Sequence, residues 1–308
     1  MIVTNVGRLV YPRGVTVENE VGSTAAASVR PQSLMFSFFG IYVLGRETAV
    51  YSGSIIDVFA RLGVSEEAVR STLARMTKRN LLTRYRKGRK AYFGLTPRAV
   101  QVLEDGRRRV QDTGAINRDW DGTWTLVAFT LPNDRGSARH DLRSRLAWAG
   151  FAPLQGGLWI AAGTRDVAAD LAPLELGDHL TTLQARPLGP TESADLVRRA
   201  FDVGEIAARY EAFLKRWDTS TPPAADDDLA CQVSLHTDWL QLVRQDPHLP
   251  AEHLPQRWPA IRAEQVFRLL DRKIAPGARA SASALLEEID LCTHTDGSVT
   301  SCPVPSSA

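Results

Sequence analysis

Cysteine is scarce in this chain of 308 residues, which holds three widely spaced cysteines, Cys231, Cys292 and Cys302. This number and spacing suit neither a disulfide framework nor a cluster of metal ligands, and we expect a reducing cytoplasm. Long hydrophobic runs are also missing. No stretch of about 18 apolar residues occurs, which excludes a membrane span. Residues 1–30 lack the apolar block of a secretory signal, and we expect a flexible N-terminal arm there.

The composition excludes a chain that is disordered throughout, because its fractions of hydrophobic residues (44%) and charged residues (23%) are near the average of globular proteins. The length predicts two or three domains. The net charge of +2 indicates no particular partner, but its distribution does. Residues 65–110 hold 13 Lys and Arg against 4 Asp and Glu, a local charge of +9 that leaves −7 for the rest. Such a block is typical of a nucleic-acid-binding module; a solvated helix face is the alternative.

Three helices are predicted, two before this block and one at its start. An apolar run covers Ser33–Gly45, and helical spacing continues over Ser54–Leu62 until Gly63 ends it. Ser65 offers an N-cap hydroxyl for the third helix, whose first turn is acidic and which ends near Arg79.

The third helix has two distinct faces at about 100° per residue. One face is the predicted core side: Val69, Thr72, Leu73 and Met76. The opposite face offers guanidinium groups, a hydroxyl and a small residue, which suit the major groove of DNA. Our candidate DNA contacts on or next to this face are Ser65, Glu67, Arg70, Ser71, Arg75 and Lys78, and Ala74 allows close approach.

A β-hairpin is predicted after this helix, with strands over Leu81–Arg86 and Ala91–Leu95. Its tip is basic, and the candidate phosphate contacts are Arg86, Lys87, Arg89 and Lys90. Thr96 and Pro97 then begin a fourth helix. Three helices followed by a basic hairpin predict a winged helix-turn-helix over residues 31–112, with the third helix in the groove and the hairpin on the phosphate backbone.

The middle part, residues 118–190, alternates strands and helices. Strands are predicted over 124–131, 151–154, 157–162 and 179–185, with helices over 134–148 and 165–171. The order strand–helix–strand–strand–helix–strand predicts a ferredoxin-like domain.

The third part, residues 191–275, is predicted to be helical, with helices over 193–217, 229–243 and 261–270. A tail is expected over 276–308, disordered from about Thr293. We find no catalytic constellation and no metal site. His236, His248 and His253 are spaced by 12 and 5 residues, which fits no helical pair of ligands, so we interpret them as structural.

Three stretches in order resemble the PaaX-type transcriptional regulators: Arg30–Ala99, Trp120–Ala161 and Leu242–Ala260 (LVRQDPHLPAEHLPQRWPA). The resemblance covers roughly residues 30–270. It implies a repressor of phenylacetic acid catabolism genes that binds an operator in double-stranded DNA, dimerises through the middle domain and is released by an aryl-acyl-CoA inducer such as phenylacetyl-CoA.

An acyl-CoA inducer needs an apolar slot for its ring and cations for its phosphates. The candidate ring partners are Trp148, Trp159, Trp239 and Trp258, and the candidate phosphate partners are Arg143, Arg145, Arg244 and Arg257. For each one, a core tryptophan or a surface arginine is the simpler interpretation. No other cofactor is expected.

The middle domain also implies a second hypothesis, because in this family it is similar to a small CRISPR-associated nuclease that dimerises through its sheet and holds metal on an aspartate ending its first strand. Here that position is Thr130, a poor ligand for a hard cation. Asp134 follows in the loop, where helix capping is the simpler role. A protein-interaction module stays open, whereas RNA is disfavoured because no aromatic stacking platform accompanies the helix.

The sequence therefore predicts an α+β protein with an N-terminal winged helix-turn-helix, a middle ferredoxin-like α/β domain and a C-terminal helical domain that senses the effector. We interpret it as a cytoplasmic, homodimeric transcriptional repressor rather than an enzyme, with the metal-dependent nuclease as the alternative.

Overall fold

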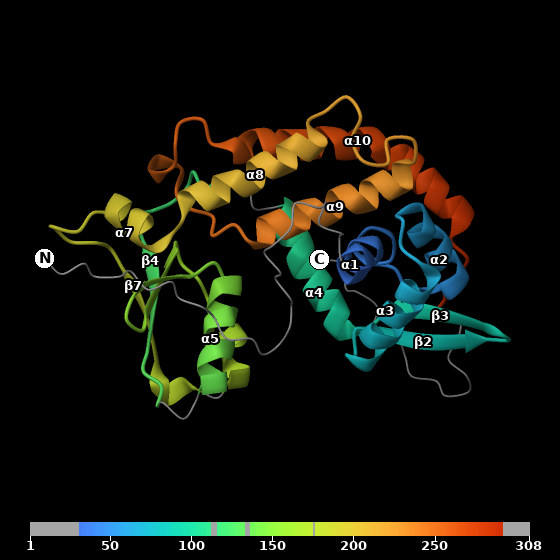
Figure 1. Ribbon diagram of the computed structural model, residues 1–308. Helices are drawn as coiled ribbons and strands as arrows, with labels where there is room; N and C mark the ends of the chain where they lie inside the picture. Colours follow the sequence, from blue (N-terminus) through green and yellow to red (C-terminus); the bar gives the residue numbers. More distant parts are fainter. Residues whose placement is uncertain (1–30, 112–115, 133–135, 175, 292–308) are drawn as a thin grey trace, which may run out of the picture. The chain divides into compact units, whose positions relative to one another are not determined.

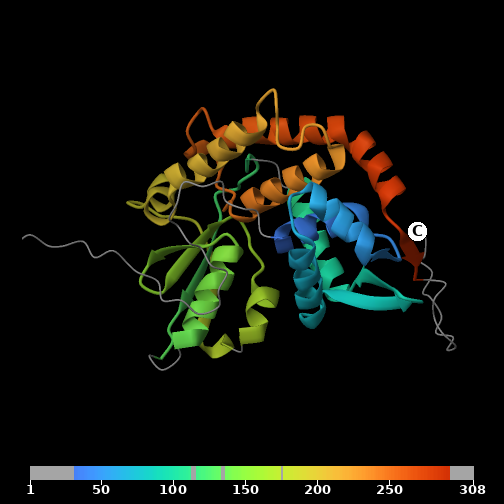
Figure 2. The same ribbon diagram turned by 45° about the vertical axis from the view of Figure 1, so that its right-hand side comes forward.

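The computed structural model describes residues 31–111, 116–132, 136–174 and 176–291, so the predicted arm and the residues after 291 lie outside it. The described chain is α+β, with two four-stranded antiparallel sheets and helices around them (Figures 1 and 2). None of its helices has the length and apolar character that crossing a membrane requires.

The N-terminal part follows the predicted order of three helices, a hairpin and a fourth helix. Its elements are α1 (Pro31–Tyr42), β1 (Thr48–Tyr51), α2 (Ser52–Arg61), α3 (Glu66–Lys78), β2 (Leu82–Lys87), β3 (Lys90–Leu95) and α4 (Pro97–Gln111). Ser65 caps α3 by accepting a hydrogen bond from the Ala68 amide, and Thr96 caps α4 through the Ala99 amide. The sequence missed β1, because four residues that lead directly into α2 give no separate strand signal.

The middle part has the predicted order of strands and helices: β4 (Trp124–Phe129), α5 (Gly136–Trp148), β5 (Ala152–Gln155), β6 (Leu158–Ala162), α6 (Ala168–Leu171) and β7 (Leu180–Ala185), with 3₁₀ turns at Ala172–Leu174 and Gly177–His179. The strand order in the sheet is β5-β6-β4-β7, antiparallel throughout. Both faces are covered, because β4 alternates: Val127 packs on the α5 side, whereas Trp124 packs with residues of the C-terminal helices.

The C-terminal part is helical, with α7 (Ser193–Ala200), α8 (Val203–Trp217), α9 (Asp228–Arg244), a 3₁₀ turn (Ala251–His253) and α10 (Pro259–Leu285). The single helix predicted over 193–217 is in fact two helices. The break occurs at Phe201 and Asp202, where the Asp202 carboxylate caps α8 by accepting from the Glu205 amide at 2.8 Å.

The structure also corrects the predicted tail. Residue 276, where the tail was expected to begin, lies inside α10, and β8 (Glu288–Asp290) follows (Figure 2). A proline in the interior of a helix normally ends or kinks it. α10 continues through Pro276, and buried small residues beyond it, such as Ala278 and Ala282, pack the helix on its neighbours. β8 pairs with β1, so the first sheet has the order β2-β3-β1-β8 and contains residues from both ends of the described chain.

Helix α9 connects the N-terminal helices to the C-terminal ones, because it packs against α1, α4, α8 and α10. A buried polar network crosses this contact. The Tyr42 hydroxyl donates to Gln232 Oε1 at 2.8 Å, and Gln232 Nε2 donates to Asp271 Oδ1 at 2.9 Å. His236 Nε2 lies 2.8 Å from the same Asp271 oxygen. The network satisfies buried polar groups on three helices and fixes their register.

Candidate nucleic-acid interface

Helix α3 presents the polar face that the sequence predicts. Its core side chains Val69, Thr72, Leu73 and Met76 are buried. The candidate contacts are all exposed: Ser65, Glu67, Arg70, Ser71, Arg75 and Lys78. The helix therefore offers three cations and two hydroxyls to solvent along one surface.

Two of these cations have partners within the helix. Arg70 Nε donates to Glu66 Oε1 at 2.7 Å, and both side chains are about 60% exposed. Arg75 Nη2 donates to Thr72 Oγ1 at 3.3 Å. An exposed pair of this kind contributes at most about 1 kcal/mol, so a phosphate or a guanine edge can displace it.

The hairpin of β2 and β3 is closed by Gly88 and Arg89, because Lys87 pairs directly with Lys90. Gly88 has φ of +60°, a left-handed conformation that glycine adopts without strain. The predicted phosphate contacts are exposed here: Arg86, Lys87, Arg89 and Lys90.

Arg84 was missed in the sequence analysis. It is exposed on β2 and lies two residues before Arg86, so both side chains project from the same face of the hairpin. On the neighbouring strand β3, Arg84 pairs with Phe93, which is a core residue, and Arg86 pairs with Ala91. The period-two alternation in Leu82–Lys87 was the signal that could have identified Arg84.

Lys90 differs from the other hairpin cations because an acidic residue is bound to it. Its Nζ donates to Glu287 Oε2 at 2.6 Å and lies 4.8 Å from the centre of the Tyr51 ring. The Tyr92 hydroxyl donates to Glu287 Oε1, also at 2.6 Å. The hydrogen bond to Glu287 raises the pKa of Lys90, and the hydrogen bond from Lys90 lowers the pKa of Glu287. Both groups are therefore charged at neutral pH.

The predicted effector residues are not gathered at one place. Trp159, Trp239 and Trp258 are core side chains, and Trp239 stacks on Phe267 with ring centres 4.7 Å apart. Trp148 is 60% exposed on α5. Arg143 and Arg145 also lie on α5, whereas Arg244 ends α9 and Arg257 is exposed in the turn before α10. Spacing along the chain could not predict this separation.

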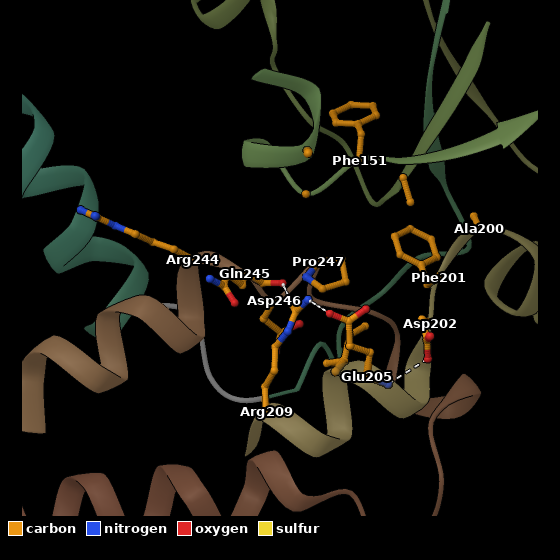
Figure 3. A pocket seen from close by; sticks show the side chains of 14 residues that line it. Phe151, Ala200, Phe201, Asp202, Glu205, Arg209, Arg244, Gln245, Asp246 and Pro247 are labelled. Carbon is orange, nitrogen blue, oxygen red and sulfur yellow. Dashed lines mark hydrogen bonds and ion pairs between the residues drawn. The ribbon is translucent and has the colours of Figure 1, made fainter. Parts of the chain in front are cut away.

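A cavity of about 230 Å³ lies where α5 and β5 meet α7, α8 and the end of α9 (Figure 3). Its lining is mixed, with Phe151, Phe201 and Ile206 beside Asp202, Glu205, Arg209, Arg244, Asp246 and Pro247. Arg209 is paired with Glu205, and the Arg244 side chain extends away from Asp246 toward α4. A second, apolar cavity of about 220 Å³ lies against β4 and β6 and is lined by Trp124, Leu126, Leu158 and Ile160 among others.

The residues considered for metal binding are apart. His236 is bonded to Asp271, and the His253 ring packs edge-on against Trp120. Thr130 is exposed after β4, and Asp134 lies outside the described residues. Within the described ranges, no group of three His, Cys, Asp or Glu side chains is placed to hold a metal ion.

His248 is expected to make stability depend on pH. Burial lowers its pKa below the usual value of about 6.5, although Asp246 opposes this shift. The folded state therefore favours the neutral ring. The contribution of this ring to the free energy of unfolding is fully present above about pH 6.5 and is lost as the pH falls further. We expect the temperature of the unfolding midpoint to decrease when the pH is lowered from 7.5 to 5.5. The decrease should be smaller in His248→Asn, which has no titrating ring; asparagine is chosen because it tolerates the residue's φ of +57°. An equal fall in both proteins would contradict this role.

Basic side chains are exposed both on α3 and on the adjoining β2–β3 hairpin, and this arrangement places the chain among candidate nucleic-acid-binding proteins. Three family models match the chain in order: "PaaX-like protein" over residues 30–99, "PaaX protein central Cas2-like domain" over 117–197 and "PaaX-like protein C-terminal domain" over 201–284. The chain belongs to the PaaX family.

The chain is also similar to one curated protein and to one solved structure. The chain is 27% identical over 271 residues to the transcriptional repressor PaaX of Escherichia coli K12, covering 84% of each chain. The solved structure of the uncharacterized protein Rv0674 from Mycobacterium tuberculosis has a TM-score of 0.57 and 19% identity, with 83% of this chain and 99% of that chain covered. The second likeness concerns the fold alone.

Proposed function

We propose that this chain is a transcriptional repressor of an aromatic acid (phenylacetate-type) catabolic operon, active on DNA in the cytoplasm. The observation that carries the proposal is the joint exposure of basic side chains on α3 and on the β2–β3 hairpin, in a chain that belongs to the PaaX family. On this proposal α3 enters the major groove, and the hairpin contacts the phosphate backbone.

Three features support the finer architecture that the sequence predicts. The order α1, α2, α3, β2, β3 is that of a winged helix-turn-helix. The order of β4–β7, with the antiparallel arrangement β5-β6-β4-β7, is that of a ferredoxin-like domain. The helices from α7 to α10 form the helical part to which we assign effector sensing.

A homodimer follows from the same proposal. β7 is an edge strand of the middle sheet, and its exposed residues Thr181, Thr182, Leu183 and Gln184 carry no charge. Uncharged edges pair readily with another strand, and two copies would meet there antiparallel. Such a dimer reads two half-sites separated by about one helical turn of DNA, roughly 34–36 Å, or a multiple of it.

The experiment that tests the function is a gel shift with DNA from the gene's own upstream region, titrated with aryl-acetyl-CoA thioesters and, in parallel, with the free acids. We expect a salt-sensitive complex that one thioester releases and its free acid does not. A chain with no salt-sensitive affinity for DNA would be a protein-interaction module instead, and Mg²⁺-dependent loss of the DNA would favour the nuclease.

Replacing Arg89 with glutamine should weaken binding to every DNA sequence alike. Arg89 is exposed in the hairpin turn, so we expect it to contact phosphate and not a base. Loss of one phosphate contact lowers the slope of log affinity against log salt by about 0.9. Fluorescence anisotropy at several salt concentrations measures that slope. Lys215→Gln on α8 is the matched control, and a change in sequence preference without a change in slope would contradict the assignment.

A further inference from the structure

The segment after α10 lies beyond all three family models, the last of which ends at residue 284. It is nevertheless part of the N-terminal sheet. Ala49 pairs with Ile289 and Thr48 with Asp290, and Ile289 is only 6% exposed against Ala49 and Tyr92. The last described strand of the chain therefore completes the sheet that contains the basic hairpin.

Two hydrogen bonds of its backbone hold Glu287 beside the hairpin. The Tyr51 amide donates to the Glu287 carbonyl at 2.8 Å, and the Glu287 amide donates to Ser54 Oγ at 3.0 Å. With the main chain fixed on both sides, the carboxylate lies between two donors, Lys90 Nζ and the Tyr92 hydroxyl. A carboxylate held by an ammonium and a phenol in this way occupies the position of an anion bound to the hairpin.

We propose that Glu287 is an internal competitor of DNA phosphate for Lys90, and that β8 is the element that holds it there. The bound carboxylate neutralises Lys90 and repels an approaching phosphate, so DNA must displace it or bind without this cation. In this scheme Glu287 affects DNA binding only through Lys90. The competition also makes hairpin affinity depend on the placement of α10, because β8 follows that helix after two residues.

This inference rests on the proposed function and is tested in the full-length chain with Glu287→Gln. Glutamine keeps the size of the side chain and can still accept from Tyr92, but it removes the negative charge. We expect tighter binding to any duplex DNA at low salt, because Lys90 becomes available. One added phosphate contact steepens the salt slope by about 0.9, so the advantage of the variant should shrink about 3.5-fold between 50 and 200 mM salt.

Glu288→Gln is the matched control, because it makes the same charge change at the neighbouring residue, the first of β8. Glu288 accepts from Arg46 Nη1 at 2.9 Å, and its ion pair is with Arg46 and not with a hairpin cation. We expect its salt slope to equal that of the wild type. An equal gain in both variants would reveal a general charge effect and overturn the proposal.

A double-mutant cycle then identifies Lys90 as the cation concerned. Lys90→Gln should reduce affinity more in the Glu287→Gln background than in the wild type. Equal losses in both backgrounds overturn the proposal, as does unchanged affinity of a folded Glu287→Gln. If that variant proves unstable, Glu287→Asp keeps the charge but withdraws it from Lys90, and its affinity must still exceed that of the wild type. A wild type that lacks salt-sensitive DNA binding would instead refute the proposed function.

Discussion

Replacing Arg75 with alanine is expected to weaken specific DNA binding by about 1–3 kcal/mol, which is roughly a 5- to 150-fold rise in the dissociation constant. Arg75 is exposed on α3, on the face opposite the buried Leu73 and Met76. A guanidinium group on a helix in the major groove forms two hydrogen bonds with a guanine edge, and alanine makes neither. The measurement is a titration of DNA from the gene's upstream region, with unrelated DNA in parallel.

The control for this prediction is Arg272→Ala, which removes an exposed arginine from α10. Its affinity should match that of the wild type. Arg75→Ala should lose most of its preference for the specific fragment, whereas its affinity for unrelated DNA should fall much less. Equal losses on both DNAs would make Arg75 a phosphate contact, and unchanged affinity on both would remove α3 from the interface.

Replacing Trp239 with alanine is expected to lower the free energy of unfolding by about 3–5 kcal/mol. The Trp239 ring is 3% exposed, stacks on Phe267 and packs against Phe213, so it joins α9 to α10 and α8. Alanine leaves a cavity that three packed helices cannot close. Denaturant unfolding followed by circular dichroism gives the change.

Two further substitutions make the Trp239 result specific. Trp148→Ala removes a ring that is 60% exposed, and we expect a change of at most about 0.5 kcal/mol. Trp239→Phe should cost less than alanine, because it keeps an aromatic ring and removes an indole N–H that has no partner among the described residues. A loss in Trp148→Ala as large as that in Trp239→Ala would contradict the assigned packing.

Local patterns were enough to predict α3 and the hairpin. Ser65 supplies a cap, the 3.6-residue period separates Leu73 from Arg75, and Gly88 permits the tight turn; each signal lies within a few residues of the structure it determines. The same holds for the order of strands and helices along the middle part. Exposure of the basic side chains followed from these patterns without any knowledge of the tertiary structure.

The errors occurred where distant segments meet. Pro276 and the Ala- and Ser-rich composition suggested a tail, yet packing on α9 retains the helix across them. This result cannot be read from the chain, because retention of a helix across a proline depends on which elements pack over it. The predicted effector residues stay a prediction: Trp239 and Trp258 are core side chains, which is the simpler interpretation that the sequence already offered for each of them.

The sequence by itself determined the basic helix, the basic hairpin and the charge of +9 over residues 65–110, which contain them, because capping, periodicity and turn chemistry act between neighbours in the chain. Only the tertiary structure decided that Glu287 lies against Lys90, 197 residues away. That contact depends on β8 joining β1 in the sheet, and strand pairing between the two ends of the described chain leaves no local signal in either segment.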